Sequence, residues 1–182
     1  MKRTLLNMLK KTGLLILLGL LIYGIKFTFD LSFSGTEDIK IVKDYDSLLS
    51  IEELIDQPAF KNKVLYIDIW GVYCKPCINQ FRLMPAIKKQ LKNEAVEFIY
   101  ISTPYGYFND EQLWKAAIKK YKLKGYHVHA SMQFYENIWE EVEGIEDKWS
   151  IPHYLLVDKD GKIANPNAPA PIHEEALLAE LT

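Results

Sequence analysis

Cysteine is scarce in this chain, which has only two among its 182 residues. So few cysteines exclude a small secreted scaffold held by several disulfides, and a zinc site with four thiolate ligands. A basic excess is also missing, because the formal net charge is −2, which argues against a protein that neutralises nucleic-acid phosphates. The chain has 49% apolar and 25% charged residues and no repeats, which is typical of one globular domain and excludes a disordered or collagen-like chain.

Charge is distributed unevenly along the chain. The first 35 residues hold five bases and one acid, which leaves 17 bases and 23 acids, a net charge of −6, for residues 36–182. Leu14–Ile25 is an uncharged apolar run, and Thr12–Phe29 extends it to 18 residues if Lys26 reaches the membrane interface. At about 1.5 Å per residue, a helix of this length spans about 27 Å, which is enough for the apolar core of a bilayer.

The flanks of this apolar run predict its orientation. Four bases precede it, so we expect a cytoplasmic N-terminus and export of the rest of the chain. A cleaved signal peptide is the alternative, but residues 26–30 are bulky and offer no small-residue cleavage site. We therefore expect a transmembrane anchor at 1–30, a linker at 31–38, and a domain at 39–182 on the periplasmic or extracytoplasmic side of the cytoplasmic membrane.

Strand and helix signals alternate after the linker. Val64–Trp70 is apolar on both faces apart from Asp68, which is typical of a central strand. Asp46 lies where it could cap a helix, and Pro85 is expected to kink another. Strands are also predicted at 39–42, 96–102, 126–130, 153–157 and 162–164, and helices at 46–57, 77–91, 110–121, 134–142 and 172–181. The pattern predicts an α/β fold with a central mixed sheet flanked by helices.

The two cysteines form the run Cys74-Lys75-Pro76-Cys77, between the predicted central strand and the next helix. Two cysteines placed at random in such a chain fall three residues apart only about once in a hundred cases, so the spacing indicates redox chemistry. Helix N–H groups and the charge of Lys75 favour a thiolate, which predicts Cys74 as the nucleophile. Cys77 can then attack the resulting mixed disulfide. The alternative is a pair of inert core cysteines.

The run Trp70-Gly71-Val72-Tyr73-Cys74-Lys75-Pro76-Cys77, followed by Pro85, resembles the active-site region of thioredoxin-fold proteins. The N-terminal anchor, Ile151-Pro152 and the segment at 154–162 narrow the resemblance to the TlpA/ResA-type membrane-anchored thiol–disulfide oxidoreductases, over residues 37–182. This resemblance implies a thioredoxin-like fold with an inserted strand–helix element, which 105–149 can accommodate. Tyr73 departs from the usual tryptophan, and Gln80 stands where some members carry a functional glutamate.

The resemblance places Asp68 as a buried acid under the disulfide. Independently, a carboxylate between Ile67 and Ile69, in a strand buried on both faces, is expected to have a raised pKa because burial penalises the charged form. Such a group can accept the Cys77 proton as Cys77 attacks the mixed disulfide. The alternative is a partly solvated aspartate at a strand end.

The resemblance also assigns three residues to substrate binding. It implies a cis bond before Pro152, which would face the cysteines and leave the backbone of Ile151 free to pair with an extended substrate. We expect Trp70 to pack beside Cys74 as part of this site, with an ordinary core position as the alternative.

The family further implies an enzyme that reduces protein disulfides without a cofactor, in some members for cytochrome c maturation. An exported reductant needs electrons from across the membrane, so a transmembrane thiol-relay donor is an expected partner. Nucleic acid is not an expected partner.

Histidines suggest a rival function. His127 and His129 alternate with Val128 and so share one strand face, where a surface polar stripe is a more common arrangement than a metal site. His153 follows Pro152 and could approach Cys74. A Cu(I) metallochaperone using both cysteines and a histidine is therefore the alternative function, because soft thiolates suit Cu(I).

Overall fold

A computed structural model of the protein describes the backbone of residues 2–31, 33–106 and 108–182, and the side chains of residues 11–25, 33–106 and 108–182. The chain divides into two compact units, Met1–Phe33 and Ser34–Thr182. The first unit contains helix α1 (Lys2–Leu31), on which the large apolar side chains between positions 14 and 25 are exposed. In the described part of the chain, no helix has both the length and the apolar character needed to cross a membrane.

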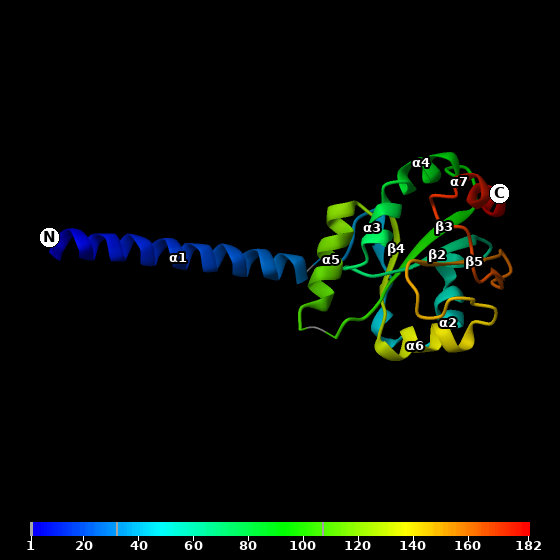
Figure 1. Cartoon of the computed structure of the whole chain (residues 1–182), viewed down its shortest axis with the longest axis horizontal. Helices are drawn as coiled ribbons and strands as arrows, with labels where there is room; N and C mark the ends of the chain where they lie inside the picture. The colour runs from blue at the N-terminus through cyan, green and yellow to red at the C-terminus, as the bar shows by residue number, and fades with distance from the viewer. Residues whose placement is uncertain (1, 32, 107) are drawn as a thin grey trace. The chain divides into compact units, whose positions relative to one another are not determined.

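The second unit is built on a six-stranded sheet with the order β1-β4-β3-β2-β5-β6 (Figure 1). Strands β1, β4, β3 and β2 run parallel to one another, whereas β5 runs antiparallel to both β2 and β6. The strands are β1 (Ile39–Ile41), β2 (Val64–Trp70), β3 (Val96–Ser102), β4 (Gly125–His129), β5 (His153–Val157) and β6 (Ile163–Asn165). The predicted mixed sheet with Val64–Trp70 at its centre is confirmed.

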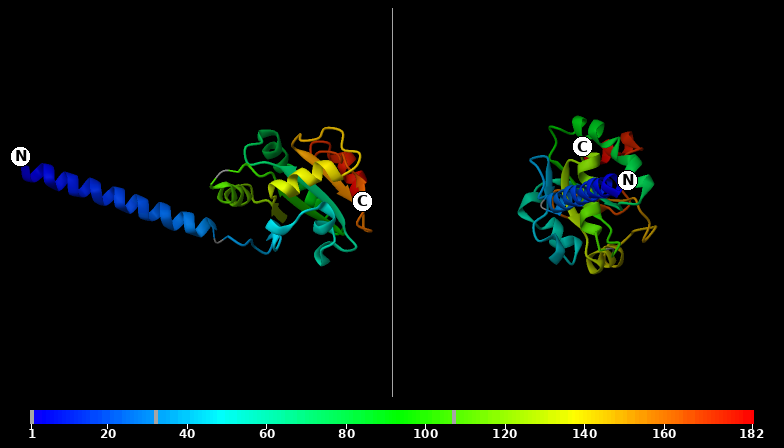
Figure 2. Two further views of the ribbon diagram at one scale, coloured as in Figure 1. Left: turned by 90° about the horizontal axis from the view of Figure 1, so that it is seen from below. Right: turned by 90° about the vertical axis from the view of Figure 1, so that its left-hand side faces the viewer.

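Helices cover both faces of this sheet, as the three ribbon views show (Figures 1 and 2). The helices are α2 (Ile51–Ile55), α3 (Lys75–Phe81), α4 (Met84–Gln90), α5 (Asp110–Tyr121), α6 (Met132–Glu141) and α7 (Glu174–Leu181), with short 3-10 turns η1 (Tyr45–Ser47) and η2 (Pro58–Phe60). The fold class predicted from the alternating pattern is therefore confirmed for this unit.

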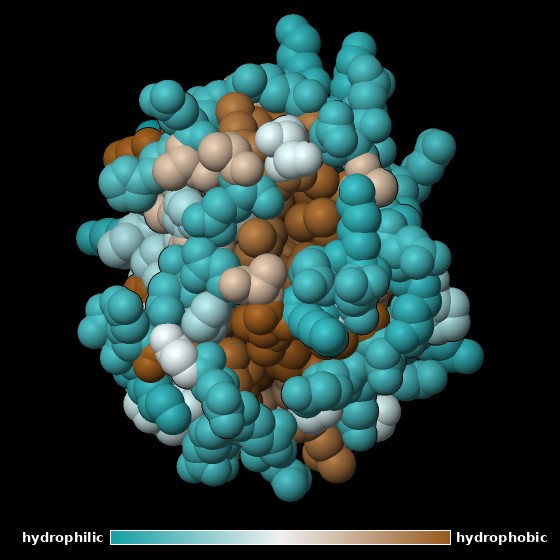
Figure 3. Space-filling model, turned by 90° about the vertical axis from the view of Figure 1, so that its right-hand side faces the viewer, coloured by the Kyte–Doolittle hydropathy of each residue, from teal (hydrophilic) through white to brown (hydrophobic). Residues whose placement is uncertain are grey.

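One face of the sheet carries the main apolar core. Leu65, Ile67 and Ile69 of β2 lie in a buried cluster with residues of α2 and α6, such as Leu54 and Phe134. Each such side chain contributes about 1.5–3 kcal/mol when it is removed from water. Figure 3 shows a side of the molecule where hydrophilic residues cover most of the surface and hydrophobic ones are visible in a furrow between them.

The opposite face of the sheet is polar and aromatic. Strand pairing places Tyr154, Asp68, Tyr100 and His127 in one row across β5, β2, β3 and β4. All four side chains are buried, and the rings of Tyr100 and His127 stack with centroids 5.0 Å apart. The surface stripe expected for His127 and His129 is therefore wrong, because this face is covered by helices. The Trp114 ring of α5, for example, lies 5.2 Å from that of His129.

Two predicted helices differ in the structure. The helix expected at 77–91 is divided into α3 and α4, because Pro85 lies in the first turn of α4, where its missing N–H would have no helical partner. The helix expected at 46–57 begins only at Ile51. Its N-cap is Ser50, whose hydroxyl accepts the Glu53 N–H at 3.2 Å, so the predicted cap at Asp46 is wrong.

The buried His127 predicts how stability depends on pH. Burial lowers its pKa from 6.5 to about 3, although its Nε2–H donates to the Leu123 carbonyl at 2.8 Å. Between pH 6.5 and about pH 3, His127 is therefore protonated in the unfolded chain but neutral in the folded chain. Through this residue, the free energy of unfolding falls by up to about 1.4 kcal/mol for each unit by which the pH is lowered.

We expect His127→Gln to flatten the decline of unfolding free energy between pH 6.5 and pH 4, measured by urea denaturation at each pH. His173→Gln, at an exposed position, is the matched control and should keep the wild-type slope. An unchanged slope in His127→Gln would show that this histidine is not the group responsible.

Candidate active site

Cys74 and Cys77 are joined in a disulfide at the turn between β2 and α3, with Cα atoms 5.3 Å apart. Cys74 is the N-cap of α3, and its Sγ accepts the backbone N–H of Cys77 at 3.1 Å. A donor aimed at this sulfur stabilises a thiolate once the disulfide is reduced. Cys74 is 9% exposed and Cys77 is fully buried. The more accessible sulfur is thus the one predicted to attack, and its bonded neighbour lies beneath the surface.

The loop before β5 lies at the same end of the sheet. The Ile151–Pro152 bond is cis, and His153 directly after it pairs with Ile69 of β2. A Cβ built on Gly71 would be only 3.1 Å from Cδ1 of Ile151, so the Ile151 side chain lies against the segment that leads into the disulfide. The structure therefore places the predicted Ile151 beside Gly71, three residues before Cys74, with Pro152 next to it in the chain.

Asp68 lies in the middle of β2, where it is 1% exposed. Neither carboxylate oxygen has a hydrogen-bond partner among the described residues. Burial raises the pKa of this carboxyl well above its usual value, and the charge of Lys88 opposes the shift only in part. Asp68 is thus a buried carboxyl whose protonated form is favoured, not a solvated strand-end residue.

Asp68 shares a face of β2 with Trp70, whose ring contacts Phe81 of α3 edge-on at 5.1 Å. Trp70 is wholly buried, so in this structure its indole is inaccessible to a substrate. The expected substrate contact of Trp70 is therefore corrected to the alternative of a core aromatic. Its packing against Phe81 fixes α3 over the strand that carries Asp68.

Lys88 of α4 was not singled out from the sequence. Its Nζ donates to the carbonyl of Lys124 and lies 4.9 Å from the centre of the Tyr100 ring, and Tyr100 pairs with Asp68 across the sheet. Burial lowers the pKa of Lys88 to about 7, against the opposing charge of Asp68. The sequence signal is weak, because Lys88 adjoins the apolar positions of an ordinary amphipathic helix.

Gln80, which stands where some TlpA/ResA-type proteins carry glutamate, has a structural contact. Its side-chain oxygen accepts the backbone N–H of Ile172 at 3.0 Å. This hydrogen bond joins the last turn of α3 to the loop before α7.

No group of three or more histidine, cysteine or acidic residues within the described residues is arranged to hold a metal ion. The Nε2 of His153 donates to the Pro166 carbonyl at 2.7 Å, and its ring contacts Trp139 at 5.2 Å. His153 is therefore engaged within the fold, and the Cu(I) alternative is not favoured.

Comparison with known proteins matches this chain to the Redoxin family over residues 37–181. It is 25% identical over 162 residues to the thiol-disulfide oxidoreductase ResA of Bacillus cereus, covering 85% of this chain and 87% of that protein. ResA of Bacillus subtilis is 24% identical over 157 residues, with 84% and 80% covered.

Solved structures show the same fold. A thiol-disulfide oxidoreductase from Bacteroides fragilis superposes with a TM-score of 0.52 at 22% identity, covering 70% of this chain and 85% of that one. StoA from Bacillus subtilis gives a TM-score of 0.52 at 18% identity, with 67% and 84% covered. These matches support a thioredoxin-like fold for the second unit.

The unpaired carboxylate predicts the behaviour of Asp68→Asn. Because the folded pKa of Asp68 is raised, the wild type loses stability as the pH rises from about 4 towards that pKa, by up to about 1.4 kcal/mol per unit. The amide carries no such cost, so we expect the variant to be more stable at pH 7, measured by urea denaturation, and the difference to shrink towards pH 4.

The same variant should slow thiol–disulfide exchange, since the Cys77 proton loses its acceptor, while Cys74 in the reduced protein is still alkylated readily. Stopped-flow exchange between pH 6 and pH 8, beside iodoacetamide labelling, measures both. Exchange kinetics identical to wild type would make Asp68 a purely structural residue.

Proposed function

Because this chain belongs to the Redoxin family and is a thiol–disulfide oxidoreductase of thioredoxin-like fold, we propose that it reduces disulfides of protein substrates outside the cytoplasmic membrane. The observation that carries this proposal is the buried Cys74–Cys77 disulfide directly after β2, with the buried Asp68 on β2 itself and the cis Ile151–Pro152 bond directly before the paired strand β5. Asp68 and Cys74 belong to one stretch of chain, and Ile151, whose side chain lies against Gly71, comes from a segment distant in sequence.

The reaction begins with the reduced protein. The Cys74 thiolate attacks one sulfur of a substrate disulfide, which forms a mixed disulfide and releases the first substrate thiolate. Cys77 then gives its proton to the Asp68 carboxylate, and the Cys77 thiolate attacks Sγ of Cys74. The second substrate thiolate leaves, and two electrons have passed to the substrate. The protein ends with the Cys74–Cys77 disulfide, the form seen in the structure.

Each neighbouring group assists one of these steps. The Cys77 N–H directed at Cys74 Sγ stabilises the attacking thiolate. The backbone of Ile151 pairs with an extended substrate chain, which holds the substrate sulfur in line with Cys74. Proximity to Cys74 gives Cys77 a high effective concentration for an intramolecular attack, and its burial denies it access to other disulfides.

We propose the reducing direction from the Lys75-Pro76 dipeptide, because proline in this position resembles the reducing members of the TlpA/ResA-type proteins. An exported reductant must be re-reduced, so its partner is a transmembrane thiol relay that delivers electrons from the cytoplasm. Cytochrome c maturation is one role consistent with this chemistry, and Gln80 in place of glutamate makes a general protein-disulfide substrate the simpler assignment.

We further propose that α1 anchors the protein in the membrane. Its apolar side chains from Leu14 to Ile25 are between 52% and 70% exposed, except where glycine intervenes, and burial of such a surface in lipid is favourable. The four basic residues of α1 that precede Leu14 orient the N-terminus towards the cytoplasm.

Trapping separates the roles of the two cysteines. Cys77→Ala should still attack substrates but cannot release them, so mixed disulfides with native partners accumulate on Cys74. Cys74→Ala should trap little, because Cys77 is buried. Non-reducing electrophoresis and mass spectrometry identify the trapped species, which dithiothreitol should dissolve. Equal trapping by both variants would reverse the assignment, and trapping by neither would favour metal binding.

Fractionation tests the anchor. We expect the intact protein to sediment with membranes, to resist extraction with alkaline carbonate, and to begin at or near Met1 by N-terminal sequencing. A version lacking residues 1–31 is the control and should be soluble. A natural protein that is soluble and begins near Ser32–Gly35 would contradict the anchor and support a cleaved signal.

A further inference from the structure

The loop that leaves β3 runs directly beside the disulfide turn. The Thr103 N–H donates to the Trp70 carbonyl at 2.8 Å, which extends the pairing of β3 with β2 up to the residue before Gly71. A Cβ built on Gly71 would collide with the hydroxyl of Tyr105. Glycine at position 71 therefore lets the Tyr105 side chain lie over the segment that leads to Cys74.

Tyr105 also contacts the residue next to the nucleophile. Its ring packs edge-on against Tyr73, with centroids 5.2 Å apart and planes at 81°. Tyr73 directly precedes Cys74 and is 59% exposed. Cδ1 of Ile151 is 3.1 Å from the same Cβ position of Gly71, so Tyr105 and the loop before β5 both lie at the segment that leads to the disulfide.

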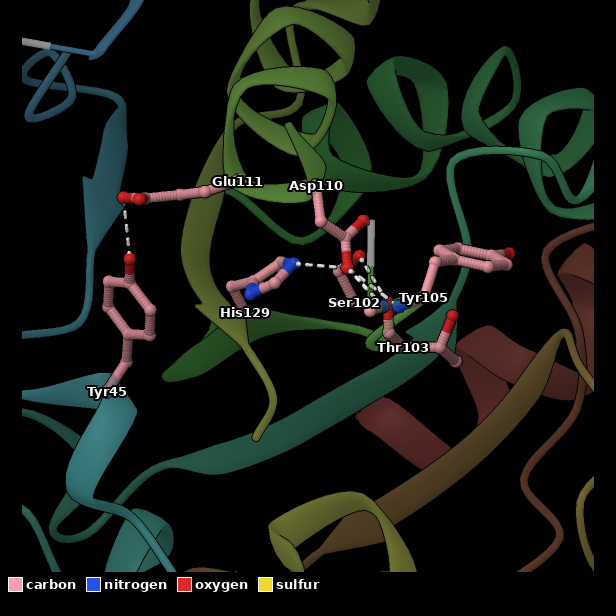
Figure 4. Close-up of polar contacts among 8 residues, drawn as sticks. Tyr45, Ser102, Thr103, Tyr105, Asp110, Glu111 and His129 are labelled. Atoms are coloured by element: carbon pink, nitrogen blue, oxygen red, sulfur yellow. Dashed lines mark hydrogen bonds and ion pairs between the residues drawn. The ribbon is translucent and has the colours of Figure 1, made fainter. Parts of the chain in front are cut away.

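Asp110, the first residue of α5, holds this loop in place (Figure 4). Its Oδ2 accepts the backbone N–H of Tyr105 at 2.6 Å and that of Gly106 at 3.3 Å. The carboxylate is buried, and Nε2 of His129 lies 3.5 Å from the same oxygen. Two charge-assisted hydrogen bonds from consecutive backbone groups fix the direction in which Tyr105 leaves the loop.

We propose that Tyr73 and Tyr105 form an aromatic clamp that contacts the residue flanking the reactive cysteine of a polypeptide substrate, and that Asp110 positions Tyr105 within it. The substrate class is a disulfide-bonded polypeptide with an aromatic residue beside its cysteine. This inference rests on the proposed function and adds to it a preference among polypeptide substrates.

The chemistry of the clamp supports this class. When a substrate cysteine is bonded to Cys74, the next substrate residue lies about 3.4 Å further along the extended substrate chain. Its side chain is then within reach of the Tyr73 ring, which adjoins Cys74. Tyrosine offers a large apolar face with little conformational freedom to lose, and aromatic pairs gain about 0.5–1.5 kcal/mol beyond area burial. Phe108, on the same loop, is 98% exposed and lies outside the clamp, so it provides a matched control.

The test uses the reduced protein and two synthetic peptide disulfides that differ only in having phenylalanine or serine beside the cysteine. Hydroxyethyl disulfide, which has no flanking residue, reports the chemistry itself. Second-order rate constants come from stopped-flow fluorescence. We expect the wild type to prefer the phenylalanine peptide by about two- to tenfold, the range given by one aromatic pair.

Tyr105→Ala should bring this ratio close to one, and Tyr105→Phe should restore it, because the ring makes the contact. Asp110→Ala should lower the ratio, and Asp110→Asn, which keeps an acceptor oxygen, should recover part of it. Phe108→Ala should behave as wild type. The ratio compares two substrates on one sample, so a variant that folds poorly still gives an interpretable value.

A wild type that reduces hydroxyethyl disulfide but shows no peptide preference would overturn the clamp and leave the proposed function standing. A preference that survives in Tyr105→Ala, or that is lost equally in Phe108→Ala, would also overturn it. A wild type that reduces none of the three disulfides would overturn the proposed function itself.

Discussion

The burial of one ionisable carboxyl, Asp68, is the constraint around which this domain is arranged. A carboxylate without a hydrogen-bond partner among the described residues is costly to remove from water, so Asp68 lowers the stability of the fold at neutral pH. In the proposed reaction the Cys77 proton passes to this same carboxyl. Tyr100 and Tyr154 flank it in the adjacent strands and shield it from solvent. The packing of Trp70 against Phe81 then fixes α3, and with it the cysteines, over the same strand.

The two faces of the sheet contribute differently, one mainly to stability and the other to the proposed chemistry. The face covered by α2 and α6 carries a continuous apolar cluster, beside which His153 is buried against Trp139. The other face carries the buried aspartate, tyrosines and His127, together with the half-buried Lys88 of α4. Apolar packing on one side offsets the desolvation cost on the other, which is how a single domain of this size keeps such a polar row inside.

Local patterns in the sequence predict much of this structure. The strand at Val64–Trp70 and the helix at Asp110–Tyr121 have the predicted bounds, because their periodicity is uninterrupted. Because β2 ends as predicted at Trp70, the cysteine pair lies at the strand-to-helix turn, as predicted. Long-range contacts were beyond prediction. The burial of His127, the fully enclosed Trp70 and the place of Tyr105 over Gly71 depend on segments that are distant in sequence. The break between α3 and α4 shows how one proline can begin a helix instead of bending it.

The hydrogen bond from the Ile172 N–H to Gln80 joins the end of the cysteine-bearing helix to a loop 92 positions further along the chain. Cys77 and Gln80 lie three residues apart on α3, on neighbouring turns of the helix, so this hydrogen bond ties the cysteine-bearing helix to the segment that leads into α7. The loop at the far end of the chain is thereby part of the scaffold that holds the redox-active helix in place.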